Sequence, residues 1–326
     1  MPAPPRLLLP GYLTLITSRI ETGLPLVCTT YMKTILLGIM ARAQHLYDVE
    51  VCGFIFMGNH FHFLLSVKDP GNVVGFIDRI KTESAHAVNR LLGRRQRTIW
   101  HNGYDALPIL TVHDAVEKFV YIYTNPQTAG LVSKIGDYPG LSSWELWRSG
   151  KTTKAAPWVR RIFLEKLSEP SLSVAEDESL TAKLLKKCKK SHTFRLNYEA
   201  WFYCLKVTDP AEKRRLTSKI QERIREEEAQ LDRQRKGTVV GSLLLKEAAI
   251  NKEFEPKTFS NRQWCICHDV PKRKSFIACV KKLRAEARAV WQEWKNGNYA
   301  ARYPVGLFPP SLPRNANLIP FAMSVT

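Results

Sequence analysis

Residues 49–67 read VEVCGFIFMGNHFHFLLSV, and this stretch decides the fold of the first half of the chain. Residues 49–57 and 60–67 are rich in β-branched and aromatic side chains, which is typical of β-strands. Gly58-Asn59, which separates them, is a turn dipeptide. The sequence therefore predicts two antiparallel strands joined as a hairpin.

The segments around this hairpin complete a recognisable order of elements. Residues 12–17 and 107–112 read as strands, and apolar residues recur at helical spacing in residues 29–46 and 73–92. The order β-α-β-β-α-β is that of the ferredoxin-like plan. We therefore expect an α+β fold, in which an antiparallel sheet carries helices on one face.

A further helix is predicted over residues 115–124. His113-Asp114 stand where a helix cap is expected, and Asn125-Pro126 stand where the helix should end. We expect this helix to pack on the sheet formed by the preceding segments.

The chain is strongly basic, and its charge is unevenly distributed. The net charge is +19, yet residues 1–150 carry 14 Lys and Arg against 11 Asp and Glu. Such an excess favours a polyanion partner, because Lys and Arg displace counterions from a phosphate backbone. The C-terminal half holds most of this excess, which a solvated basic surface would also explain.

Three parts are expected along the chain. Residues 1–150 form the first domain, the polar and acidic stretch within residues 151–182 reads as a linker, and residues 183–326 read as a basic, mainly helical extension. The charged run at 212–236 and the amphipathic pattern at 276–295 predict long helices in that extension.

His60-Phe61-His62 is the first candidate for chemistry. On a strand, residues i and i+2 point to one face, so the two imidazoles project together while Phe61 faces the other way. Two imidazoles on a rigid sheet can supply two nitrogen ligands to a divalent metal ion. Taken alone, the pair is equally compatible with ordinary histidines on an edge strand.

Tyr121 and Asn125 form the second candidate, since a spacing of four residues places both on one helix face. A tyrosine can attack phosphorus and form a covalent phosphotyrosine, although its phenol, with a pKa of about 10, needs assistance at neutral pH. The Asn125 amide oxygen offers a third metal ligand. Core packing by Tyr121 and a helix-ending Asn-Pro would explain the same residues.

Together the motifs resemble those of the HUH single-tyrosine transposases. GNHFHFLLSV (58–67) is similar to the HUH motif, and YIYTNPQTAGLV (121–132) followed by DYPGLSSW (137–144) is similar to the catalytic-tyrosine segment. Within that family the chain most resembles the REP-associated tyrosine transposases. The resemblance covers roughly residues 10–148, with Gly58 in place of the usual Pro and Trp144 in place of the common Tyr.

The resemblance implies a metal-dependent endonuclease and strand transferase for single-stranded DNA next to a hairpin or palindromic repeat. It implies a Mg²⁺ or Mn²⁺ ion held by His60 and His62, with Asn125 at the position of the third ligand. It implies Tyr121 as the nucleophile, which takes the 5′ phosphate and leaves a free 3′-OH.

Basic and aromatic residues make up the predicted DNA-binding surface. Arg94, Arg95 and Arg97 can hold phosphates, and Trp100 can stack on an unpaired base. The remaining predicted contacts lie in the C-terminal half: Lys186, Lys187, Lys213, Arg214, Arg215, Lys272, Arg273 and Lys274. We expect this half to clamp duplex or hairpin DNA; a basic helical addition for folding or protein contact is the alternative.

Two other functions are compatible with this sequence: a non-catalytic hairpin DNA-binding protein on the same fold, and an RNA-binding protein, because sheets of this plan also bind RNA. The presence of both histidines, the tyrosine and the asparagine favours the enzyme. Seven cysteines without a regular framework favour a reducing cytoplasm, where a DNA partner would imply nucleoid association. No membrane partner is expected, and a homo-oligomer is left open.

Overall fold

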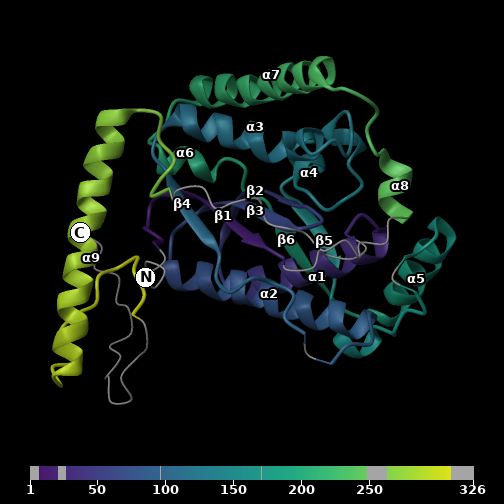
Figure 1. Cartoon of the computed structure of the whole chain (residues 1–326), viewed down its shortest axis with the longest axis horizontal. Helices are drawn as coiled ribbons and strands as arrows, with labels where there is room; N and C mark the ends of the chain where they lie inside the picture. The colour runs from purple at the N-terminus through teal and green to yellow at the C-terminus, as the bar shows by residue number, and fades with distance from the viewer. Residues whose placement is uncertain (1–6, 21–26, 96, 170, 248–262, 310–326) are drawn as a thin grey trace.

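The computed structural model describes residues 7–20, 27–95, 97–169, 171–247 and 263–309. Its centre is a four-stranded antiparallel sheet in the order β2-β3-β1-β4 (Figure 1). The strands are β1 (Leu13–Arg19), β2 (Glu50–Phe56), β3 (His60–Ser66) and β4 (Asp105–Ile109). With the helices that connect them, they have the connectivity of a ferredoxin-like unit, so the predicted α+β fold is confirmed.

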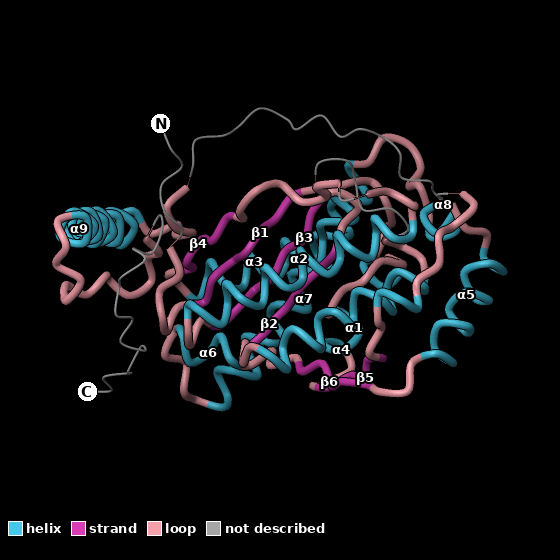
Figure 2. The backbone as a smooth tube through the Cα atoms, turned by 90° about the horizontal axis from the view of Figure 1, so that it is seen from below, coloured by secondary structure: helices cyan, strands magenta, loops and turns pink. Residues whose placement is uncertain are grey.

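Helices cover both faces of this sheet (Figures 1 and 2). The helices α1 (Thr30–Leu46) and α2 (Pro70–Leu91) lie on one face, as the sequence predicts. Phe63 packs its ring 5.7 Å from that of Phe76 in α2, whereas the neighbouring His62 faces Tyr121. Because successive side chains of a strand point to opposite faces, the helix that holds Tyr121 adds a second layer on the other face.

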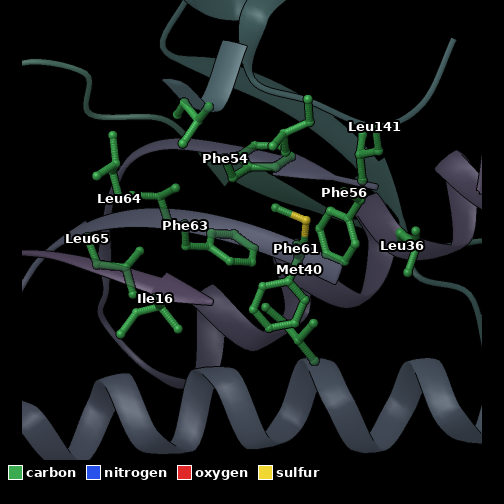
Figure 3. Close-up of a cluster of buried hydrophobic side chains, with 14 of the residues drawn as sticks. Ile16, Leu36, Met40, Phe54, Phe56, Phe61, Phe63, Leu64, Leu65 and Leu141 are labelled. Atoms are coloured by element: carbon green, nitrogen blue, oxygen red, sulfur yellow. The ribbon is translucent and has the colours of Figure 1, made fainter. Parts of the chain in front are cut away.

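The hairpin is fixed by paired aromatic side chains (Figure 3). Phe54 stands opposite Phe63 and Phe56 opposite Phe61 in the β2–β3 register, and all four rings are buried. The rings of Phe54 and Phe63 stack at 5.5 Å. A slip of one residue would send these rings to the opposite face of the sheet. The register that the rings fix therefore also fixes the face to which His60 and His62 point.

Helix α3 (Val112–Thr128) is longer than the predicted 115–124. It begins after Thr111, whose side chain caps the first turn, and it continues through Pro126. Proline removes one backbone hydrogen bond from a helix, but packing offsets that loss here. Pro126 is buried, and Gln127 donates to Glu228 of α7 (Pro210–Gln234) at 2.7 Å.

Residues 151–182 do not form a linker, and this prediction is wrong. They contain β5 (Thr153–Pro157), the short helix η2 (Arg161–Phe163) and most of α5 (Val174–Lys187). β5 pairs with β6 (Ser191–Arg195), and the α5 residue Asp177 accepts hydrogen bonds from the backbone N–H groups of Thr30 and Tyr31 at 2.8 and 2.7 Å. Asp177 thus caps the first turn of α1, and the core runs across the predicted domain boundary.

The remaining elements are mainly helical, as predicted for the C-terminal half. Short helices η1 (Ile135–Asp137) and α4 (Trp144–Arg148) follow α3, and α6 (Ala200–Cys204) and α8 (Ser242–Glu247) flank α7. α7 packs on α3 and buries Leu216, Ile220 and Ile224. α9 (Val270–Lys295) lies at one end of the molecule and buries an apolar stripe (Figure 1). Among the described helices, none has the length and apolar character that a membrane span requires.

The cap on α1 gives a stability prediction. Asp177→Ala leaves two backbone N–H groups of the first turn without their buried acceptor, so the free energy of unfolding should fall by about 2 kcal/mol in urea titrations. Glu178→Ala, at the exposed neighbouring position, should change it by less than about 0.5 kcal/mol. Equal effects of the two substitutions would contradict the structural role assigned to this segment.

Candidate active site

β3 and α3 bring His60, His62 and Tyr121 together on the same side of the sheet. The Tyr121 hydroxyl lies 3.4 Å from Nε2 of His62, and their ring centroids are 5.3 Å apart. The His60 ring lies 4.6 Å from the His62 ring. His62 is only 4% exposed, whereas Tyr121 is 42% exposed, so an accessible tyrosine lies beside a buried histidine.

Neighbouring side chains orient both imidazoles through their Nδ1 atoms. Thr17 Oγ1 on β1 lies 2.8 Å from Nδ1 of His62, and Asn59 Oδ1 lies 2.6 Å from Nδ1 of His60. When each oxygen accepts from an Nδ1–H group, each Nε2 carries a lone pair. Such partners for the second ring nitrogen are the usual way of orienting a metal-binding histidine.

The surroundings keep both imidazoles neutral. Burial and, to a smaller extent, the charge of Arg19 lower the pKa of His60 to about 4. Burial also takes the pKa of His62 well below its usual value, with His60 and Lys118 adding to the effect. Neutral imidazole is the form that binds a metal ion, so neither ring needs to lose a proton at neutral pH.

α3 places Asn125 one turn after Tyr121, as the spacing predicts. Burial raises the pKa of the Tyr121 phenol, while the Asn125 hydrogen bond and the charge of Arg19 lower it. Lys118, one turn before Tyr121, holds its Nζ 5.0 Å from the centre of the tyrosine ring. The phenol therefore sits in a positively charged setting that suits a phosphate.

Four residues of this site escaped the sequence analysis: Arg19, Thr17, Asn59 and Lys118. Lys118 could have been found, because it lies three residues before Tyr121 on the same helix face. Thr17 and Arg19 are opposite His62 and His60 in the β1–β3 register, which no local pattern reveals. Asn59 was identified as a turn residue and not as the partner of His60.

A divalent ion could be held by the two imidazoles and the Asn125 amide oxygen. Within the part of the chain that the structure describes, no group of three or more His, Cys, Asp or Glu could hold a metal ion. Imidazole nitrogens suit transition metals, and oxygen ligands suit Mg²⁺ and Mn²⁺. The mixed donor set fits a divalent ion that keeps open positions for water and phosphate.

Two neighbouring tyrosines are less accessible than Tyr121. Tyr123 is fully buried, and its hydroxyl lies 2.8 Å from Ser143 Oγ, which hydrogen-bonds the backbone of Phe54 on β2. Tyr104 is also buried. Only the exposed hydroxyl among these three faces the histidine pair.

Trp100 is not a stacking platform, and this prediction is wrong. Its side chain is 5% exposed, its Nε1 donates to Ser84 Oγ at 2.9 Å, and its ring packs 4.9 Å from Phe61. Its backbone forms a bridge with Ile20, at the end of β1, and this position turns the indole towards α2. The indole packs between Phe61 of the hairpin and helix α2, so it leaves no ring face exposed for a base.

The predicted basic residues lie on separate elements. Arg94, Arg95 and Arg97 follow α2, Lys186 and Lys187 end α5, Lys213 to Arg215 begin α7, and Lys272 to Lys274 begin α9. α5 and α9 are at opposite ends of the molecule (Figures 1 and 2), so these groups do not form one surface. Some are already paired: Lys187 contacts Glu165, and Arg215 contacts Glu212.

We compared the chain with protein families, solved structures and curated proteins. The model of the family "Transposase IS200 like" matches residues 26–124, which contain His60, His62 and Tyr121. A solved REP-associated tyrosine transposase bound to a REP hairpin is similar at 19% identity, with a TM-score of 0.40 over 46% of this chain and 86% of that one. No curated protein matches the sequence. The match to the family model confirms the predicted resemblance to transposases over residues 26–124.

The burial of Trp100 can be tested by measuring the free energy of unfolding of a Trp100 variant. Trp100→Phe removes the hydrogen bond to Ser84 and leaves a small cavity beside Phe61, so the free energy of unfolding should fall by about 1–3 kcal/mol. Trp291→Phe, at a half-buried position of α9 where an aromatic ring is kept beside Trp294, should change it by no more than about 0.5 kcal/mol. A Trp100 variant as stable as the wild type would mean that the indole is not part of the core.

Proposed function

We propose that this chain is a metal-dependent endonuclease and strand transferase for single-stranded DNA at hairpin or palindromic repeats. Tyr121 is its nucleophile. The observation that carries the proposal is the 3.4 Å approach of the Tyr121 hydroxyl to Nε2 of His62, with His60 alongside. The family match over the same residues supports a transposase-like reaction and favours it over RNA binding.

His60, His62 and Asn125 would hold the Mg²⁺ or Mn²⁺ ion. When bound, the ion polarises the scissile phosphate and stabilises charge on its oxygens. The Asn125 amide has both donor and acceptor groups, so it can hydrogen-bond Tyr121 and still present its carbonyl oxygen. Thr17 and Asn59 keep the two Nε2 atoms turned towards the site.

The reaction is a transesterification. The Tyr121 oxygen forms a bond to phosphorus, the bond from phosphorus to the 3′ oxygen breaks, the phenol loses its proton and the 3′ oxygen gains one. The product is a 5′-phosphotyrosine and a free 3′-OH. The phosphotyrosine keeps the energy of the broken bond, so a 3′-OH from another end can reverse the step and join strands without a nucleotide cofactor.

Local charge assists this attack. The hydrogen bond from Asn125 and the charge of Arg19 favour the ionised phenol, and so oppose the effect of burial. Lys118 beside the tyrosine ring adds a positive charge where the phosphate must approach. Before the attack these groups stabilise the ionised phenol, and during the attack they stabilise negative charge on the phosphate.

The nucleophile is tested by trapping the covalent intermediate. Labelled hairpin DNA with single-stranded flanks, incubated with the wild type and Mn²⁺, should give a protein–DNA adduct on a denaturing gel. Tyr121→Phe removes the attacking oxygen, so the adduct should fall roughly 1000-fold or more. Tyr203→Phe, at a tyrosine that is 77% exposed and outside the site, should retain it.

Two outcomes would contradict this assignment. An adduct of normal yield in Tyr121→Phe would exclude Tyr121 as the nucleophile. Tight hairpin binding by the wild type without any adduct would indicate a non-catalytic DNA-binding protein on the same fold.

The metal ligands are tested by Mn²⁺ binding, measured by the electron paramagnetic resonance signal of the free ion. His60→Ala with His62→Ala should weaken Mn²⁺ affinity at least about 100-fold, and Thr17→Val, which removes the partner of Nδ1, about 10-fold. His86→Ala, at an exposed histidine of α2, should have no effect. Chelation with EDTA should stop cleavage by the wild type. Unchanged Mn²⁺ affinity in the double variant would exclude the histidine pair as the metal site.

A further inference from the structure

A pocket with a volume of about 530 Å³ lies between α3 and the start of α9. One wall comes from α3 and includes Glu117 and Lys118. The other comes from the C-terminal half of the chain and includes Trp264, Ile266, Arg273 and Ile277. This second wall lies outside residues 26–124, so the matched family segment does not account for the pocket.

The pocket adjoins the candidate active site through Lys118. This side chain lines the pocket and also holds its Nζ 5.0 Å from the centre of the Tyr121 ring. Lys118 and Tyr121 are neighbours on one face of α3, one helical turn apart. A ligand bound in the pocket would therefore lie next to a phosphate that contacts Tyr121.

The C-terminal wall is attached firmly to the catalytic half. Ile266 donates its backbone N–H to the Pro108 carbonyl at 2.8 Å and accepts from the Leu110 N–H at 3.1 Å, which extends the sheet edge at β4. The backbone N–H of His268 donates to the Asp114 carboxylate on α3 at 3.1 Å. These contacts hold the wall at a constant position relative to α3.

The lining has the chemistry that a nucleotide needs. Trp264, Ile266 and Ile277 supply aromatic and apolar surface for a base, and Lys118 and Arg273 supply positive charge for the phosphates on either side. The two carboxylates of the lining already have partners: Asp114 accepts from the His268 backbone N–H, and Glu117 pairs with Arg223. The guanidinium of Arg284 lies 4.2 Å from the centre of the Trp264 ring and holds the indole in the wall. The volume lies within the range of small-ligand pockets and accommodates one nucleotide.

We propose that this pocket binds one unpaired nucleotide of the DNA strand, adjacent to the nucleotide that Tyr121 attacks. The inference rests on the proposed function, because it takes the strand at Tyr121 to be single-stranded DNA. It assigns the segment at 263–277 a role in holding the strand in register for cleavage, with Trp264 as the stacking residue and Arg273 as a phosphate contact.

The test measures binding without cleavage. Fluorescence anisotropy of a labelled, random-sequence, single-stranded 20-nucleotide DNA in EDTA gives the dissociation constant of each variant. Trp264→Ala should weaken binding about 5- to 100-fold, the usual effect of losing one stacked base, while Trp264→Phe, which keeps an aromatic face, should stay within about threefold of the wild type. Trp291→Ala, on α9 outside the pocket lining, should bind like the wild type.

Ultraviolet crosslinking of the same complex locates the contact. A nucleotide should be found by mass spectrometry on the peptide that contains Trp264. The pocket would not be a nucleotide site if Trp264→Ala bound the DNA with wild-type affinity. The same conclusion would follow if Trp264→Ala and Trp264→Phe lost equal DNA affinity and no crosslink formed at Trp264. A normal Tyr121 adduct alongside that result would leave the proposed function standing, whereas a wild type that neither binds the DNA nor forms the adduct would overturn both.

Discussion

The register of the β2–β3 hairpin is the constraint on which the candidate site depends. Phe54 faces Phe63 and Phe56 faces Phe61 across the hairpin, and these rings fill the core beneath α1 and α2 (Figure 3). Because side chains alternate along a strand, the same pairing sends His60 and His62 to the opposite face. The register that packs the core therefore also places the two candidate metal ligands, His60 and His62.

The candidate site also requires α3 to pack closely on the sheet. Residues that are far apart in the chain make this close packing possible. Gly53 on β2 has no side chain, and a Cβ atom there would come within 3.1 Å of Ile122 and 3.2 Å of Phe119. α7 covers the outer side of α3 and holds its last turn through the Gln127–Glu228 hydrogen bond. The C-terminal half therefore helps to position Tyr121, although its sequence reads as a separate basic extension.

Local patterns predicted much of the fold and the centre of the site. Strand alternation placed His60 and His62 together, and helical spacing placed Asn125 beside Tyr121. The sequence failed where long-range packing decides the outcome: Trp100 is buried against α2, and the acidic stretch near Asp177 caps a helix that begins 147 residues earlier. Neither contact has a periodic signal, because each depends on how distant elements meet.

The role of Tyr121 is tested most directly by locating the covalent nucleotide. After cleavage of hairpin DNA and digestion with trypsin, the peptide spanning residues 119–134 holds both Tyr121 and Tyr123. Fragmentation by tandem mass spectrometry should place a nucleotide 5′-phosphate on Tyr121, because its hydroxyl is exposed beside His62. A nucleotide on Tyr123 or on any other residue would contradict the proposed arrangement of the site.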